Sequence, residues 1–199
     1  MISVPFAVLR HAPTVWNAEK RLQGMSDTPL SAEGEARART WRLPAPADSW
    51  RRVSSPLQRA RRTAELLQPG APVTIDRRLR EMSFGIWEGL SIAELRATIG
   101  ERFIQAEQRG LDFEPPGGES PRQVMARLGD FTAELARNGR PAVIVAHKAV
   151  LRALLALATG WDMTGRQPVK LDWHCLHYFA ATPDGRVTLE RPNVTLATP

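Results

Sequence analysis

Residues 142–160 read AVIVAHKAVLRALLALATG, and this stretch decides the fold. Its first five residues are apolar without interruption, which is typical of a strand that is buried on both faces of a sheet. A helical run follows and stops at Gly160, a residue type that commonly ends helices. A buried strand that leads directly into a helix indicates an α/β protein with a mostly parallel central sheet.

The alternation of strand and helix extends toward the amino terminus. Short β-rich runs begin at Val4 and at Val53, and a helix is predicted from Ser31 to Trp41. A second helix is predicted after Ser55-Pro56, with the serine as its cap and the proline in its first turn. The order strand, helix, strand, helix predicts a three-layer α/β/α sandwich.

Capping-box motifs predict the starts of two later helices. Ser91 with Glu94 and Ser120 with Gln123 both have the spacing in which each side chain bonds the other residue's backbone amide. After Ser120, apolar residues recur at 3.6-residue spacing, which predicts a long amphipathic helix.

The carboxyl-terminal part predicts an antiparallel strand pair. Residues 176–181 and 186–190 flank the turn sequence TPDG. Proline-rich loops occur at 43–47 and 114–118, but neither has a core-sized segment set apart beyond it. We therefore expect a single domain over residues 1–199.

Composition excludes several classes of protein. Of the 199 residues, 43% are hydrophobic and 24% are charged, which is typical of a soluble globular protein. No apolar run approaches the roughly 20 residues that span a bilayer, and MISVPFAVLRH lacks a secretory pattern. The single cysteine, Cys175, excludes an internal disulfide framework. These features predict a cytoplasmic protein with no membrane partner.

The basic charge raises the question of a nucleic-acid partner. Lysine and arginine number 27 against 21 acidic residues, for a net charge of +6. The basic residues are scattered, only three of them are lysines, and the six tryptophans do not interleave with them. We therefore expect no nucleic-acid partner, and we assign a few arginines to specific anion contacts.

Chemistry is expected where the strands end. Arg10 and His11 follow the first strand, and His147 closes the AVIVA strand. In an open α/β sheet, ligands bind at the carboxyl ends of the strands. Either histidine alone could be a hydrogen-bonded structural residue. Together with Arg59 and Glu81, however, they can converge on one crevice.

This set of side chains suits phosphoryl transfer. Arginine forks bind the oxygens of a doubly charged phosphoryl group, and nearby cations keep an attacking imidazole neutral. Glu81 can protonate the leaving oxygen and afterwards activate water, provided that burial raises its pKa. The scheme requires no metal or other cofactor. His174, Cys175 and His177 offer too few converging ligands for a metal, because on a strand the two histidines point to opposite faces.

The chain resembles the histidine phosphatase superfamily, in the branch of the cofactor-dependent phosphoglycerate mutases and of small bacterial phosphatases. The resemblance runs from Val8 to about Leu155 through five segments that occur in family order: VLRHAPTVWNAEKRLQGMSDTPLSAEG, SSPLQRARRTAELL, LREMSFGIWEGLS, PPGGESPRQV and VIVAHKAVLRALL.

The resemblance implies a phosphoglycerate mutase-like fold and hydrolysis of a small phosphorylated metabolite. His11 would become phosphorylated, Glu81 would act as acid and then base, and His147 would be the second histidine. Substrate contacts are expected from Arg10, Asn17, Gln23, Gly24 and Arg59. The loops around Gln23-Gly24-Met25 and 103–118 are expected to set specificity.

The chain departs from the family pattern at two places. Ala12 stands where the family usually has glycine, and Lys148-Ala149 replaces two glycines. If either position needs a positive φ, alanine costs on the order of 1 kcal/mol. Lys148 is either a contact to an anionic substrate or a solvent-facing first-turn residue, and we adopt the second interpretation. We interpret Glu88, seven residues after Glu81, as a structural carboxylate.

Two alternative functions stay open. One is mutase-type phosphoryl transfer, although the family's mutases carry a longer insertion and tail that shield the phosphoenzyme from water. The other is a non-catalytic binder of a phosphorylated ligand or of nucleic acid. The sequence names no substrate, and it leaves a homodimer open.

Overall fold

A computed structural model describes residues 3–197. They contain one six-stranded sheet, whose strands lie side by side in the order β3-β2-β4-β1-β5-β6. The first four strands in this order are parallel, and β5 and β6 are antiparallel to their neighbours. The predicted, mostly parallel sheet is confirmed. The strands are β1 (Val4–Arg10), β2 (Arg51–Ser54), β3 (Val73–Ile75), β4 (Ala142–Ala146), β5 (Leu176–Ala181) and β6 (Val187–Val194).

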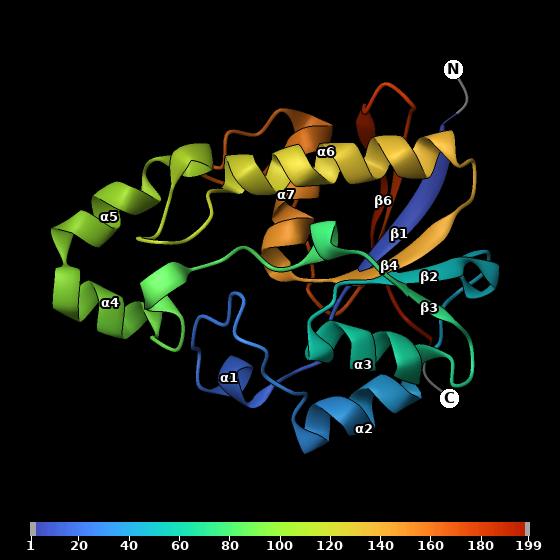
Figure 1. The fold of residues 1–199 in the computed structure, drawn as a ribbon, viewed down its shortest axis with the longest axis horizontal. Helices are drawn as coiled ribbons and strands as arrows, with labels where there is room; N and C mark the ends of the chain where they lie inside the picture. Colours follow the sequence, from blue (N-terminus) through green and yellow to red (C-terminus); the bar gives the residue numbers. More distant parts are fainter. Residues whose placement is uncertain (1–2, 198–199) are drawn as a thin grey trace.

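Helices cover both faces of this sheet (Figure 1). On one face lie α2 (Ala32–Thr40) and α3 (Gln58–Leu67), which pack with Ala7 and Leu9 of β1. On the other lie α6 (Pro121–Arg137) and α7 (Lys148–Thr159), which pack with β1 residues of the opposite parity. Because successive side chains of a strand point to opposite faces, β1 contributes to both cores. The predicted three layers are confirmed.

The predicted helix ends are largely confirmed. α4 (Ile92–Ile99) and α6 both begin with complete capping boxes, at Ser91 and Ser120. α7 ends at Gly160, whose left-handed φ of 73° only glycine adopts readily. The capping boxes and the terminal glycine each depend on residues close together in the sequence. These helix ends could therefore be predicted without knowing the tertiary packing.

Two expectations needed correction, and one strand was not expected. Ser55 does not cap α3 and Pro56 does not lie in its first turn, because the helix begins at Gln58. The Ser55 hydroxyl accepts the Leu57 amide at 3.2 Å and bonds Nε2 of His147 at 2.7 Å. β6 continues past Glu190 to Val194, through Pro192, which an edge strand tolerates because its outer amide needs no partner. The three-residue β3 had no recognisable sequence signal.

The long interval between β3 and α6 lies beside the sheet. It contains α4 and α5 (Glu101–Glu107), which extend away from the strands in Figure 1. Trp87, Leu95 and Phe103 form a small apolar core of their own here. Across residues 3–197, every helix is too short or too polar to cross a membrane.

Gly34 lets α2 approach the loop that follows His11. A Cβ at this position would overlap the carbonyl oxygen of Pro13, which also accepts the Ser31 amide at 3.0 Å. We expect Gly34→Ala to destabilise the protein by about 1–3 kcal/mol, because the added carbon forces the two segments apart. Denaturant unfolding measures this change.

The matched control is Gly129→Ala in the middle of α6, where an added Cβ meets no atom within 4 Å. Alanine favours helix over glycine, so this variant is expected to gain up to about 1 kcal/mol. Changes of the same sign in both variants would contradict the close approach inferred at Gly34.

Candidate active site

The two strand-end histidines lie side by side. β1 and β4 are adjacent and parallel, and the backbone amide of His11 donates to the carbonyl of Ala146 at 2.9 Å. The ring centroids of His11 and His147 are 5.2 Å apart, with the rings tilted by 56°. The two histidines are therefore neighbours, but only His11 lines the pocket on which both were expected to converge.

One hydrogen bond fixes the tautomer of His11. Its Nδ1 lies 2.8 Å from the carbonyl oxygen of Ala12. A carbonyl can only accept, so Nδ1 carries the proton and Nε2 keeps its lone pair. Burial, with only 6% of the residue exposed, and then the charges of Arg10 and Arg59 hold the pKa of His11 well below its usual value. The ring is therefore neutral at neutral pH, and its Nε2 lone pair is not used by Ala12.

Two arginines bring positive charge to His11. Arg59 is fully buried, and its terminal nitrogens donate to the carbonyls of Ser26 and Gly24, both at 2.8 Å. Arg10 lies beside His11 on β1. Both line the same pocket, and within residues 3–197 neither forms an ion pair and neither Nε has a partner. Buried guanidinium groups that face a cavity in this way favour an anionic ligand.

Glu81 faces the same pocket. It is 8% exposed, and its Oε1 accepts from the amides of Met82 at 3.0 Å and Ala149 at 3.1 Å. Burial raises the pKa of Glu81, although the charges of Arg59 and Arg10 oppose the shift. The raised pKa favours the protonated carboxyl group, which is the form that general acid catalysis requires.

His147 is fully buried behind His11 and is not among the residues that line the pocket. Its Nε2 bonds the Ser55 hydroxyl, while its Nδ1 has no partner in the described part of the chain. Burial, then the charges of Arg59 and His11, lower the pKa of His147 well below its usual value. The ring is therefore neutral, and one of its nitrogens is unused by the protein.

The remaining predicted contact residues all line the pocket. The side-chain oxygen of Asn17 accepts the Thr14 amide at 3.0 Å, so its NH₂ group remains to donate to a ligand. Gln23 bonds the Thr28 hydroxyl at 2.6 Å. Gly24 has a φ of +51°, and a Cβ there would overlap Glu88.

Glu88 is a structural carboxylate, as predicted. It accepts from the amides of Met25 and Ser26, both at 2.8 Å, and from the amide of Phe84 at 3.1 Å. These bonds hold the loop that carries Gln23 and Gly24 against the segment after Glu81.

The departures from the family glycines cause no backbone strain. In the part of the chain that the structure describes, the residues other than glycine with positive φ are Lys20, Met163 and Asn193. Ala12 and Lys148 are not among them, so the cost considered for alanine does not arise. Ala12 instead donates its amide to the Thr63 hydroxyl at 3.0 Å.

Several supporting residues were missed from the sequence. Ser55 and Thr63 contact the histidine segments, and Arg127 bridges the Glu81 carbonyl at 3.3 Å to Glu119 at 2.8 Å. No local motif predicts these contacts, because they join segments that are far apart in the chain. Lys148 was assigned to solvent, but it lines the pocket together with Arg152.

The carboxyl-terminal histidines are arranged differently from the strand prediction. His174 precedes β5 and is exposed, so the two histidines do not share a strand. His177 is buried, with Nε2 bonded to the Asp172 carbonyl at 3.0 Å and Nδ1 to the Asn193 amide at 3.1 Å. Both nitrogens of His177 are occupied by the protein itself.

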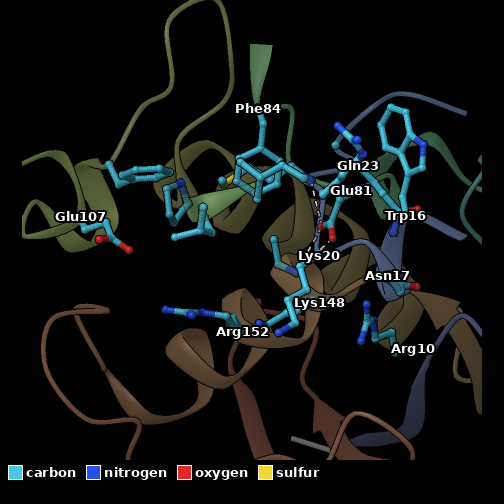
Figure 2. Close-up of a pocket in the computed structure, with 18 of the residues that line it drawn as sticks. Arg10, Trp16, Asn17, Lys20, Gln23, Glu81, Phe84, Glu107, Lys148 and Arg152 are labelled. Carbon is cyan, nitrogen blue, oxygen red and sulfur yellow. Dashed lines mark hydrogen bonds between the residues drawn. The ribbon is translucent and has the colours of Figure 1, made fainter. Parts of the chain in front are cut away.

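The pocket has a volume of about 520 Å³ and is elongated. Figure 2 shows Arg10 and Asn17 at one end and Glu107 at the other. Lys148 and Arg152 lie along the wall between these ends, and Phe84 lies on the opposite wall. The histidine end suits a phosphoryl group, and the rest has room for the group that carries it.

Comparisons with known proteins agree with this arrangement. The family profile described as "Histidine phosphatase superfamily (branch 1)" matches residues 6–195. A probable phosphoglycerate mutase GpmB of Salmonella paratyphi C is 35% identical over 170 residues, covering 82% of this chain and 79% of the relative.

Two solved structures are similar over nearly their full lengths. A mycobacterial glucosyl-3-phosphoglycerate phosphatase has a TM-score of 0.78 and 28% identity, covering 96% of this chain and 99% of the other. The α-ribazole phosphatase of Shigella flexneri has a TM-score of 0.80 and 25% identity, covering 98% and 100%.

Proposed function

Because the chain belongs to the histidine phosphatase superfamily, we propose that it hydrolyses phosphomonoesters of a small metabolite through a phosphohistidine on His11. The observation that carries this proposal is the hydrogen bond from Nδ1 of His11 to the Ala12 carbonyl. It leaves the lone pair of Nε2 available in a pocket that also holds Arg10, Arg59 and Glu81.

In the first step, Nε2 of His11 attacks phosphorus in line with the ester oxygen. The N–P bond forms as the P–O ester bond breaks, and the protonated Glu81 gives its proton to the departing oxygen. Arg10 and Arg59 stabilise the charge that spreads over the phosphoryl oxygens. The NH₂ group of Asn17, which lines the pocket, supplies a further donor.

In the second step, the phosphoenzyme is hydrolysed. The Glu81 carboxylate accepts a proton from water, whose oxygen attacks phosphorus as the N–P bond breaks. Inorganic phosphate leaves, and both His11 and Glu81 return to their starting protonation states. The amide of Ala149, near the amino terminus of α7, stabilises the carboxylate form between the two steps.

Mutase-type transfer is a second candidate, because the GpmB relatives are named probable phosphoglycerate mutases. Supplying 3-phosphoglycerate with a bisphosphate primer separates the two reactions. Release of inorganic phosphate supports the hydrolase, and formation of 2-phosphoglycerate supports the mutase. Absence of a phosphohistidine with every ester tested would instead support a non-catalytic binder.

The pH dependence of kcat/KM should be bell-shaped. Because the pKa of His11 is lowered, the acid limb should fall below the usual histidine value of about 6.5. Because the pKa of Glu81 is raised, loss of its proton produces the alkaline limb above the usual value of about 4.3. Initial rates with an alkyl phosphate across this range measure both limbs.

The Glu81→Gln variant is the control for the assignment of the alkaline limb. The ionisation of the substrate itself affects both enzymes equally, so the difference between their profiles isolates Glu81. An alkaline limb of unchanged position in Glu81→Gln would contradict the role given to this carboxyl group.

A further inference from the structure

Besides Arg10 and Arg59, four cationic side chains line the pocket and have no role in the proposed phosphoryl chemistry: Lys20, Arg21, Lys148 and Arg152. Lys148 and Arg152 lie in the first two turns of α7, four residues apart and so on one face of the helix. Both line the pocket. Within residues 3–197, no acidic side chain forms an ion pair with either, and neither charged group has a hydrogen-bond partner.

Lys148 and Arg152 are each held by an aromatic ring. Nζ of Lys148 lies 5.2 Å from the ring centroid of Trp173, and Cζ of Arg152 lies 5.1 Å from that of Trp161. Stacking on an aromatic face positions a cation without neutralising it. The two charged groups are therefore fixed in place and uncompensated.

The surrounding charges do not neutralise them either. Glu81 already accepts two backbone amides, and Glu107, on the far wall, pairs with Arg96 at 3.1 Å. Burial, then the charges of Arg10 and Arg152, lower the pKa of Lys148, and the charge of Glu81 offsets this shift only in part. This crowding of like charges would be relieved by an anion in the pocket.

The pair extends along the pocket away from the His11 end. Figure 2 shows Lys148 and then Arg152 along the wall that leads away from Arg10. Four helical residues advance by about 6 Å, so the two side chains leave α7 at successive positions along this wall. Apolar side chains of Phe84 and Phe113 line other parts of the same pocket.

We propose that the substrate carries a second anionic group, a carboxylate or a second phosphate, that Lys148 and Arg152 bind. The group that joins the two anions would lie along the apolar wall. This inference rests on the proposed function, because the phosphomonoester is taken to occupy the His11 end. Lys148 and Arg152 are thus specificity-determining residues for that reaction.

The test uses alkyl phosphonates, which cannot be hydrolysed. They are made in a series of increasing chain length, with a hydroxyl, a carboxylate or a second phosphonate at the far end. Titration calorimetry on the wild-type protein is expected to show at least about tenfold tighter binding for one of the anionic ends at the best length. The two anionic series distinguish a carboxylate from a second phosphate.

Lys148→Met keeps the apolar stem over Trp173 and removes the charge, so it should reduce this preference about tenfold. Arg152→Gln should reduce it as well, which keeps the test valid if one variant fails to fold. Lys170→Met is the matched control, because Lys170 is an exposed lysine that does not line the pocket. Lys170→Met should prefer the anionic end over the hydroxyl end to the same extent as the wild type.

Equal affinity for the three end groups in the wild type would overturn the inference. So would a loss in Lys148→Met that is the same for all three, because Lys148 would then act on the phosphonate at His11. Turnover of the corresponding phosphate esters separates this result from the proposed function. Anion preference without phosphate release refutes the hydrolase alone, whereas release with equal kcat/KM for all ends refutes the second subsite alone.

Discussion

His11→Ala is expected to lower kcat/KM for any phosphomonoester by at least about 10⁴-fold, because the variant has no atom that can accept the phosphoryl group. The tautomer of His11 leaves Nε2 as the one ring nitrogen with a free lone pair, so no other atom of this side chain can substitute for it. Phosphate release from an alkyl phosphate measures the loss. Circular dichroism confirms that the variant is folded.

The phosphoenzyme provides a second measurement. Wild-type protein mixed with an aryl phosphate and quenched in base should carry an acid-labile phosphoryl group, and His11→Ala should carry none. His174→Ala is the matched control, since His174 is exposed and lies outside the pocket. Turnover of His11→Ala within tenfold of the wild type would refute the nucleophile assignment.

Glu81→Gln is expected to lower kcat for alkyl phosphates by about 10²–10⁴-fold, because an alkoxide leaves poorly without a proton. An aryl phosphate such as p-nitrophenyl phosphate has a leaving group that needs no proton, so its first step should be largely retained. The second step still needs a base to activate water. A burst of nitrophenol with accumulation of the phosphoenzyme should therefore appear in rapid-mixing experiments.

Glu101→Gln, which changes an exposed acid of α5, serves as the control and should behave as the wild type. Equal losses for the alkyl and aryl esters, without a burst, would show that Glu81 does not act on the leaving group.

Much of the fold was predictable because its signals are local. The apolar run of β4 and the capping boxes at Ser91 and Ser120 depend on neighbours within a few residues. Ser55 was misread as a helix cap because its hydroxyl serves His147, which is 92 residues away in the sequence. Such a contact exists only once the sheet has assembled.

The sequence predicted that the candidate reacting groups lie close together, but it did not predict their surroundings. His11, Arg10, Arg59 and Glu81 were found from motifs that follow strands or open helices, and all four line one pocket. Whether Lys148 faces solvent or substrate depends on how α7 turns and on the position of Trp173. Neither is encoded near Lys148 in the sequence.

The small core of Trp87, Leu95 and Phe103 packs the α4–α5 lobe separately from the sheet. The candidate reacting groups lie at the end of β1, on α3 and in the segment after β3, whereas the α4–α5 lobe supplies the far wall of the pocket and extends away from the sheet. Substitutions in the lobe can therefore change the shape of the far wall without replacing His11, Arg10, Arg59 or Glu81. Substrate preference can in this way change while the proposed reaction stays the same.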